Sequence, residues 1–182
     1  MEAKLVRVIA GSLGGRQFDS PSGHRTHPMS EKIRGALFNI LGDISGLRVL
    51  DAFCGSGALA IESISRGAES AVAVDVDKSA HSTTTRNIAN LGLGRQVQVV
   101  RANIAGWSEH NSDELFDLIL ADPPYDHVRA SQLAACARHC RRGGVMVMSL
   151  PPSYEPDLEG LGLVLAADKN YGDARLLVAT KP

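Results

Sequence analysis

Short runs of consecutive apolar residues alternate along most of the chain with segments whose apolar residues recur every three or four positions. The first pattern is typical of strands buried on both faces of a parallel sheet, and the second of helices that cover it. The predicted strands are 47–51, 71–75, 97–101, 117–121 and 144–150, and the predicted helices are 57–66, 78–91, 104–109 and 129–140. This alternation predicts an α/β fold with a doubly wound, mostly parallel, Rossmann-like sheet.

The two ends of the chain follow a different pattern. At the N-terminal end we expect a strand over 4–10 that turns at Gly14-Gly15, a loop over 19–28 and a helix over 31–41 capped by Ser30. At the C-terminal end we expect an antiparallel edge hairpin formed by 161–166 and 175–180. The C-terminal hairpin brings the sheet to seven strands. We expect one domain over residues 1–182, with a small N-terminal hairpin and helix extension (1–42) and a core (43–182).

The first strand of the core runs into a glycine-rich segment, Asp51-Ala52-Phe53-Cys54-Gly55-Ser56-Gly57. Its glycines allow the backbone to approach a bound ligand closely. The next strand ends at Asp75, twenty residues beyond Gly55, and that spacing suits hydrogen bonds to ribose hydroxyls. Gly55, Gly57 and Ala60 also satisfy the loose fingerprint of a nicotinamide dinucleotide, so these features alone leave two cofactor classes open.

Asp51 separates the two cofactor classes, because it lies at the mouth of the glycine loop. A carboxylate there is poorly placed beside a pyrophosphate, since like charges at short range repel. It suits a ligand that carries an ammonium and a sulfonium, which describes S-adenosylmethionine. A helix-capping or turn aspartate is the alternative, but Asp51, the glycines and Asp75 occur together at the expected intervals. The sequence therefore favours S-adenosylmethionine.

A second motif, Asp122-Pro123-Pro124-Tyr125, follows the apolar strand 117–121. Two prolines fix the backbone and remove two N–H donors, so the carbonyls there point outward without a competing donor. This set suits a planar base with an exocyclic amine, because the ring can stack on Tyr125 while the amine protons bond to Asp122 and the Pro123 carbonyl. Alone, the motif could equally be a strand-to-loop turn.

The two motifs together resemble the class I S-adenosylmethionine-dependent methyltransferases that act on amino groups. Other segments resemble the bacterial RsmD-type family, which methylates N2 of a guanine in 16S ribosomal RNA: Arg7-Val8-Ile9-Ala10-Gly11, Gly15-Arg16, residues 28–39 and Tyr171-Gly172-Asp173. The resemblance spans residues 7–178, and its N-terminal segments are the specific part. One position departs from the family, since His27 stands where Arg is common; Arg25 lies two residues earlier.

Three groups of site residues follow from the motifs and the resemblance. The expected catalytic residues are Asp122, Pro123, Pro124 and Tyr125; the expected cofactor contacts are Asp51, Phe53, Gly55, Ser56, Gly57, Asp75, Val76, Asn103 and Ile104; and the expected RNA contacts are Arg7, Arg16, Arg25, His27 and Arg34. Asn103 could equally be a turn residue, and each arginine could equally belong to an ion pair. The resemblance implies 16S rRNA, or a small-subunit assembly intermediate, as the partner of a monomeric enzyme.

Charge supports an RNA partner only through its distribution. The net charge is −1, but residues 1–34 carry six Lys and Arg against three Asp and Glu, which leaves −4 for the remainder. A basic extension on an acidic core is a plausible electrostatic footprint for RNA. Apolar content of 44% is ordinary for a globular protein, and no run approaches the length of a membrane span.

Cysteine usage points to a cytoplasmic protein without a metal. Three cysteines are too few for a disulfide framework, and Cys136 and Cys140 have no second ligand pair at a suitable spacing. We therefore expect neither a metal nor a membrane partner.

Several alternatives remain open at this stage. The acid–proline motif also serves amino-methyltransferases on DNA adenine or on protein amides, although the chain has no room for a separate target-recognition domain. A non-catalytic RNA-binding or assembly protein could keep the fold, but the acidic and glycine positions are intact. A nicotinamide dehydrogenase is disfavoured by Asp51.

Overall fold

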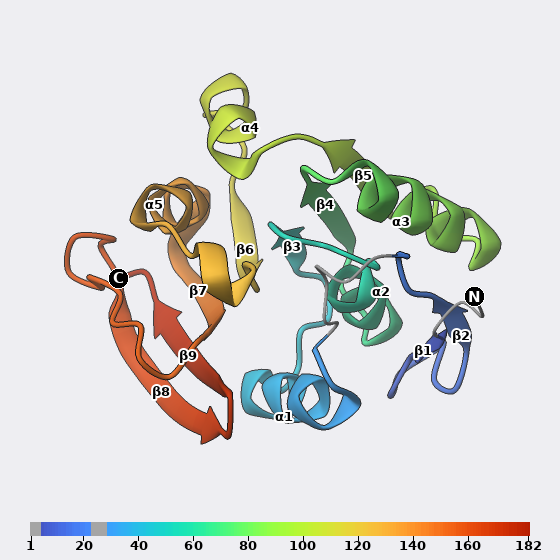
Figure 1. The fold of residues 1–182 in the computed structure, drawn as a ribbon, viewed down its shortest axis with the longest axis horizontal. Coiled ribbons are helices and arrows are strands. Elements are labelled where there is room, and N and C mark those ends of the chain that lie inside the picture. The colour runs from blue at the N-terminus through green and yellow to red at the C-terminus, as the bar shows by residue number, and fades with distance from the viewer. Residues whose placement is uncertain (1–4, 23–28) are drawn as a thin grey trace.

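The computed structural model describes residues 5–22 and 29–182, and its centre is a seven-stranded sheet in the order β5-β4-β3-β6-β7-β9-β8 (Figure 1). The strands are β3 (Arg48–Asp51), β4 (Ser70–Asp75), β5 (Val97–Arg101), β6 (Phe116–Ala121), β7 (Cys140–Leu150), β8 (Val164–Tyr171) and β9 (Ala174–Thr180). The first five are parallel, and β9 pairs antiparallel with both β7 and β8. The predicted doubly wound sheet with a C-terminal edge hairpin is confirmed.

Helices cover both faces of this sheet (Figure 1). They are α1 (Glu31–Leu41), α2 (Ala58–Ser65), α3 (Lys78–Asn90), α4 (Ile104–His110) and α5 (Ala130–Arg138), with a short 3-10 helix η1 (Tyr125–His127). The first three pack on one face and α4 and α5 on the other. Neighbouring strand residues serve opposite faces, as Val49 and Leu50 of β3 do, which is why these strands are apolar throughout.

The N-terminal extension contains a two-stranded antiparallel sheet, β1 (Leu5–Arg7) with β2 (Gln17–Asp19), followed by α1. It is attached to the core through Glu62 of α2, whose carboxylate accepts hydrogen bonds from the backbone N–H groups of Ile9 (2.9 Å) and Ala10 (3.0 Å). Asn87 of α3 holds the other side, since its amide bonds both the N–H and the carbonyl of Asp19. These partly buried bonds hold the extension against α2 and α3.

Three elements have a boundary that differs from the sequence prediction by more than two residues. β1 ends at Arg7 rather than at residue 10, because Ile9 and Ala10 bond Glu62 instead of continuing the strand. β7 begins at Cys140, since the register of β6 and β7 shifts between Phe116 and Leu118 and lets the strand start early. β8 covers 164–171 rather than 161–166, because it pairs with β9 all the way to the turn at Gly172.

Candidate active site at the reversal of strand order

The carboxyl ends of β3 and β6 lie side by side where the strand order reverses, which is where open α/β sheets bind ligands. Asp51 ends β3 and is paired with Leu120 of β6, and Asp122 follows two residues after Leu120. The topology therefore brings together the two carboxylates that the sequence placed in separate motifs.

Asp51 is completely buried, at 0% exposure. One carboxylate oxygen accepts the N–H of Ala60 (3.1 Å), in the first turn of α2, where Gly57 offers no side-chain cap. The other oxygen makes no hydrogen bond to any described residue. Burial raises the pKa of Asp51 to about 8; the N–H groups of Ala60 and Phe53 oppose this rise, although the Phe53 N–H makes no hydrogen bond of good geometry, and the charges of Asp122 and Asp75 add to it. A buried, unsatisfied carboxylate oxygen fits a cationic ligand group.

The glycine loop is shaped for close approach by a ligand. Gly55 has φ +53°, and an added Cβ there would meet no atom within 4 Å, so the space above it is open. Its N–H donates to Asp75 (2.8 Å), whose second oxygen accepts from Asp77 (2.9 Å). Burial raises the pKa of Asp75, and these N–H groups oppose that rise. The loop and Asp75 thus form one hydrogen-bonded unit.

Two residues of α3 that the sequence analysis did not single out hold this loop through its backbone carbonyls. Thr84 is buried and donates its hydroxyl to the Gly55 carbonyl (2.8 Å). Asn87 donates to the Ser56 carbonyl (3.0 Å). Their signal in the sequence was weak: two polar residues on the apolar face of a helix.

The remaining expected cofactor residues fall into two groups. Phe53, Ser56 and Val76 border the loop and the end of β4, and Val76 is 63% exposed, which leaves an apolar surface free beside Asp75. Asn103 caps α4, with its side chain accepting the N–H of Ala105 (2.9 Å), and Ile104 is buried with Trp107 in the core. Asn103 therefore acts as the N-cap of α4, and its contact with a cofactor stays a prediction, while Ile104 has only its backbone to offer to a ligand.

Asp122 lies beside two hydroxyl side chains. The hydroxyl of Ser149, from β7, is hydrogen-bonded to the Tyr125 hydroxyl (2.7 Å), and Ser149 and Asp122 line the same small pocket. Burial raises the pKa of Asp122 to about 6, and the neighbouring Ser149 hydroxyl opposes that rise. Tyr125, in η1, is 37% exposed, and burial raises its pKa as well. Pro123 is buried and Pro124 is exposed.

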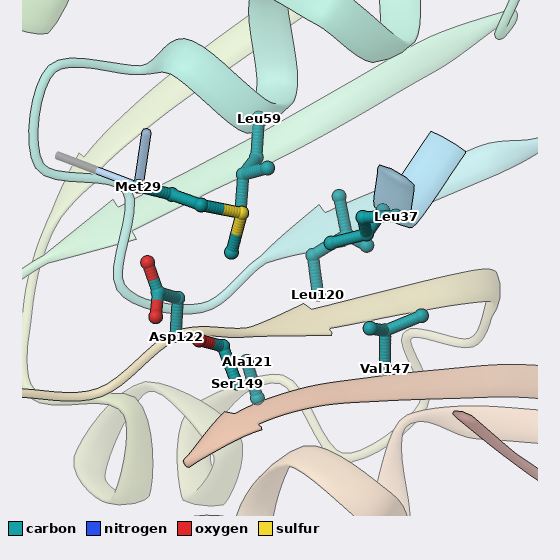
Figure 2. A pocket seen from close by; sticks show the side chains of 8 residues that line it. All are labelled: Met29, Leu37, Leu59, Leu120, Ala121, Asp122, Val147 and Ser149. Carbon is teal, nitrogen blue, oxygen red and sulfur yellow. The ribbon is translucent and has the colours of Figure 1, made fainter. Parts of the chain in front are cut away.

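An apolar wall lies beside Asp122. Figure 2 shows Met29 reaching from the segment before α1 toward Leu59 and Asp122, with Leu37, Leu120 and Val147 farther to the right. Ser149 lies on the opposite side of the carboxylate, on β7. One flank of Asp122 is therefore dry, which accounts for its raised pKa.

The expected RNA contacts are placed differently from one another. Arg7 is exposed and forms an ion pair with Glu31 (2.7 Å), and Arg16 is exposed. Arg34 is only 1% exposed: it lies 3.6 Å from the Glu62 carboxylate and donates to the carbonyls of Arg7 and Met29. Arg34 therefore has no surface to offer to a phosphate and serves the fold. Arg25 and His27 lie outside the described residues.

The described residues offer neither a metal-binding cluster nor a membrane-spanning helix. Among residues 5–22 and 29–182, no cluster of His, Cys, Asp and Glu could hold a metal ion. Nor does the described part of the chain contain a helix with the length and apolar character needed to cross a membrane.

The fold and the paired motifs define a class I methyltransferase, and solved structures agree. A methyltransferase described as yhhF from Escherichia coli superposes with a TM-score of 0.85 at 22% identity, covering 98% of both chains. The Thermus thermophilus protein TTHA0928 gives 0.82 at 27%, covering 96% of this chain and 99% of the other. The RsmC methyltransferase of T. thermophilus, solved with AdoMet and guanosine, gives 0.75 at 22% over the whole of this chain and 50% of its own.

The family model described as "Conserved hypothetical protein 95" matches residues 6–179, and the chain belongs to that family, the RsmD family. YlbH of Bacillus subtilis, which carries the provisional name of an rRNA methyltransferase, is 37% identical over 131 residues, 70% of this chain and 71% of its own. The small-subunit rRNA methyltransferase D of Buchnera aphidicola is 34% identical, and that of E. coli is 31% identical. The matched regions cover 66% of this chain and 63% and 60% of theirs, respectively. The RsmD-type resemblance is confirmed.

Proposed function

We propose that this protein uses S-adenosylmethionine to methylate the exocyclic N2 amine of a guanine in 16S ribosomal RNA, in an assembling small subunit. The relatives named as small-subunit rRNA methyltransferases support the substrate class, and the neighbour solved with AdoMet and guanosine supports the cofactor and the base. An enzyme with this substrate acts in the cytoplasm, where ribosomal subunits are assembled.

One structural observation carries the proposal. The two buried or half-buried carboxylates, Asp51 and Asp122, end neighbouring strands on the same edge of the sheet, and one oxygen of Asp51 has no partner among the described residues. A carboxylate that lacks a partner inside a fold is costly unless a ligand supplies the partner. The ammonium of a methionine moiety meets that need, while Asp75 and the open space above Gly55 suit a nucleoside.

The residues of the acceptor side would then perform the following work. S-adenosylmethionine supplies, when bound, a methyl group already activated on sulfur. Asp122 and the Pro123 carbonyl accept the two N–H protons of the amine, which favours the pyramidal nitrogen needed for attack. As positive charge develops on that nitrogen, Asp122 stabilises it more than in the ground state, and one N–H proton then leaves to Asp122 or to water, so the product is a neutral methylamine. Positioning of this kind is worth about 7–11 kcal/mol at best.

Tyr125 provides the surface on which the target base would stack. Its ring is partly exposed while its hydroxyl is anchored to Ser149. Stacking of a base on an aromatic side chain is worth roughly 1–3 kcal/mol. The base must leave its RNA context to reach this position, and stacking offsets part of that cost.

The extension formed by residues 1–42 would hold the RNA backbone. Of the basic set expected from the sequence, Arg7 and Arg16 are exposed, Arg34 is buried, and Arg25 and His27 lie outside the described residues. We propose that residues 43–182 act as the catalytic core and that the enzyme works as a monomer.

Mass spectrometry of 16S rRNA from cells that lack the protein tests the proposal. We expect one methylguanosine to be missing, to return with the wild-type gene and to stay missing with Asp122→Ala. The matched control is Asp126→Ala, because Asp126 is a neighbouring carboxylate whose side chain is 78% exposed. An unchanged set of methylated guanosines would refute the proposed substrate.

A further inference from the structure

Met29 lies between three parts of the molecule that the proposed reaction brings together. It directly precedes the Ser30 cap of α1 in the N-terminal extension, and it lines the same small pocket as Leu59 and Asp122 (Figure 2). Leu59 belongs to the first turn of α2, two residues after the last glycine of the cofactor loop. Asp122 is the carboxylate of the acceptor side. The Met29 side chain is therefore placed where the methyl donor and the acceptor must approach each other.

The backbone of Met29 is held in place. Its carbonyl accepts a hydrogen bond from the buried Arg34 (3.3 Å), and the next residue, Ser30, accepts the N–H of Ile33 (3.2 Å). The side chain, in contrast, is only half-buried. A methionine side chain is unbranched, with three rotatable bonds and a thioether that adapts to irregular partners. Met29 can therefore change rotamer while its backbone stays where it is.

The pocket between Met29 and Asp122 is filled, with no space for a water molecule. The other apolar residues that line it are no more than 5% exposed: Leu37, Leu59, Leu120, Ala121 and Val147. They belong to the close-packed interior, where a displaced side chain disturbs its neighbours. Met29 packs against this interior from its edge. Of the apolar side chains that line the pocket, Met29 is therefore the one that can give way to a planar ligand.

We propose that Met29 is a positioning residue of the acceptor site: its thioether keeps water from the inner flank of Asp122 in the free protein and packs against the target base when the base enters. This inference rests on the proposed function and deepens it. Without water on that flank, the oxygens of Asp122 stay available to the amine. Contact between a thioether sulfur and an aromatic ring is worth about 0.3–1.5 kcal/mol, and it limits the positions that the base can take.

The first measurement follows the methyl groups of the methionines by NMR, in the full chain labelled with [ε-¹³C]methionine. Of the four methionines, Met146 and Met148 are fully buried in β7 and serve as internal references. The Met29 signal is assigned by its absence in Met29→Leu. A small-subunit RNA fragment is added with S-adenosylhomocysteine, which has no methyl group to transfer.

We expect the bound RNA to shift the Met29 signal upfield, because the methyl group then lies against the ring of a base. The Met146 and Met148 signals should stay where they are. A Met29 signal that does not respond to bound RNA would overturn the proposal.

The second measurement is the titration of Asp122, followed through its ¹³C carboxyl resonance and assigned with Asp122→Asn. The wild type should titrate near pH 6. Met29→Ala admits water to the flank and should bring the pKa of Asp122 down toward that of an exposed aspartate, whereas Met29→Leu should leave it near 6. The groups that face Asp122 from the neighbouring strands, Asp51 of β3 and Ser149 of β7, are the same in all three proteins. Equal titration in the wild type and Met29→Ala would contradict the exclusion of water.

The third measurement is steady-state methyl transfer at saturating RNA. Met29→Ala should lower kcat about tenfold with little change in cofactor affinity, because the amine is less tightly confined. Met29→Leu, which has a similar volume, should recover most of the loss. The matched control is Leu47→Ala, since Leu47 is also half-buried against the same apolar cluster but precedes β3, at the end of that strand away from Asp51. An equal loss in Leu47→Ala would show that the effect is general destabilisation and would refute the role of Met29.

These measurements separate the inference from the function on which it rests. If the wild type transfers no methyl group to small-subunit RNA, the proposed function fails, and the titration still decides whether Met29 shields Asp122. If methyl transfer is present and neither the Met29 signal nor the titration responds, only the role of Met29 fails. The methyl signal is measured on the wild type, so it decides the question even if Met29→Ala does not fold.

Discussion

Asp51 and Asp122 end neighbouring parallel strands, yet the protein surrounds them in different ways. Asp51 is fully buried, helps to cap α2 and keeps one oxygen without a partner among the described residues. Asp122 is half-buried, with Ser149 on one side and an apolar wall on the other. The first environment suits a permanent positive charge. The second environment lets a carboxylate titrate near neutral pH. Such a carboxylate suits an amine that is neutral at first and becomes cationic during the reaction.

A third buried carboxylate shows what a structural site looks like. Glu62 accepts two backbone N–H groups and lies against Arg66 (2.8 Å) and Arg34 (3.6 Å). Each of its oxygens has a partner, so it requires no ligand. The contrast with Asp51 indicates that the missing partner, rather than burial itself, marks a binding group.

Replacement of Asp122 should have the largest effect and tests whether the two carboxylates have separate roles. We expect Asp122→Ala to lower methyl transfer by at least about 1,000-fold, because it removes the acceptor that stabilises the developing charge. Cofactor affinity, measured by calorimetry, should change only a few-fold. Loss of cofactor binding with normal turnover at saturating cofactor would reverse the assignment. Asp126→Ala is again the control.

Replacement of Asp51 should act on binding instead. We expect Asp51→Asn to lower the affinity for S-adenosylmethionine about 100-fold, since the amide cannot pair with the ammonium. Calorimetry measures this directly. In the wild type, binding should also release protons at pH 7, because a cation beside Asp51 lowers its raised pKa. Calorimetry in buffers of different ionisation enthalpy gives the number of protons released on binding. If the wild type and Asp51→Asn release the same number, the role of Asp51 is contradicted.

The same substitution should change stability with pH. The pKa of Asp51 is about 8 in the folded state and 3.8 in the unfolded chain, so its favourable contribution is complete below pH 4 and is lost as pH rises to 8. Without ligand, Asp51→Asn should therefore be more stable than the wild type at pH 8, by roughly 2 kcal/mol, and not at pH 4. Urea unfolding at both pH values measures the difference. A variant that is less stable at pH 8 would show that capping of α2 dominates.

Replacement of Arg34 tests whether this buried charge stabilises the fold, as its partner Glu62 does. Arg34→Met should lower the free energy of unfolding by about 3 kcal/mol, because it removes a buried partner of Glu62. Arg7→Met is the matched control: it breaks an exposed pair with Glu31 and should change stability little. If Arg34→Met unfolds like the wild type but weakens RNA binding, then Arg34 is a phosphate contact after all.

The exposed cations should give the smallest effect. Arg16→Ala should weaken RNA binding a few-fold and reduce the slope of log affinity against log salt by about one, since one phosphate contact is lost. Arg95→Ala is the control, because Arg95 is also exposed but precedes β5 of the core and does not belong to the extension. Filter binding to a small-subunit RNA fragment over a range of salt measures both. Equal slopes would remove Arg16 from the interface.

Local sequence was sufficient for the elements of the core and for the two acidic motifs, because strand runs and glycine or proline punctuation are local signals. It was insufficient for Arg34, since a helical position does not tell which face packs inward until α1 meets Glu62. Ser149 was missed for a similar reason. Within an apolar strand, a small hydroxyl is easily tolerated, and its importance arises only from the register of β6 against β7.

Asn87 imitates a peptide group. Its side-chain oxygen accepts the N–H of Asp19, and its side-chain nitrogen donates to the carbonyl of the same residue. The free edge of β2 therefore receives from Asn87 the two hydrogen bonds that a neighbouring strand would provide. The amide nitrogen also reaches the Ser56 carbonyl. Separation of β2 from α3 would therefore disturb the turn that we propose holds the nucleoside, and an acidic replacement at Asn87 would repel both carbonyls at once.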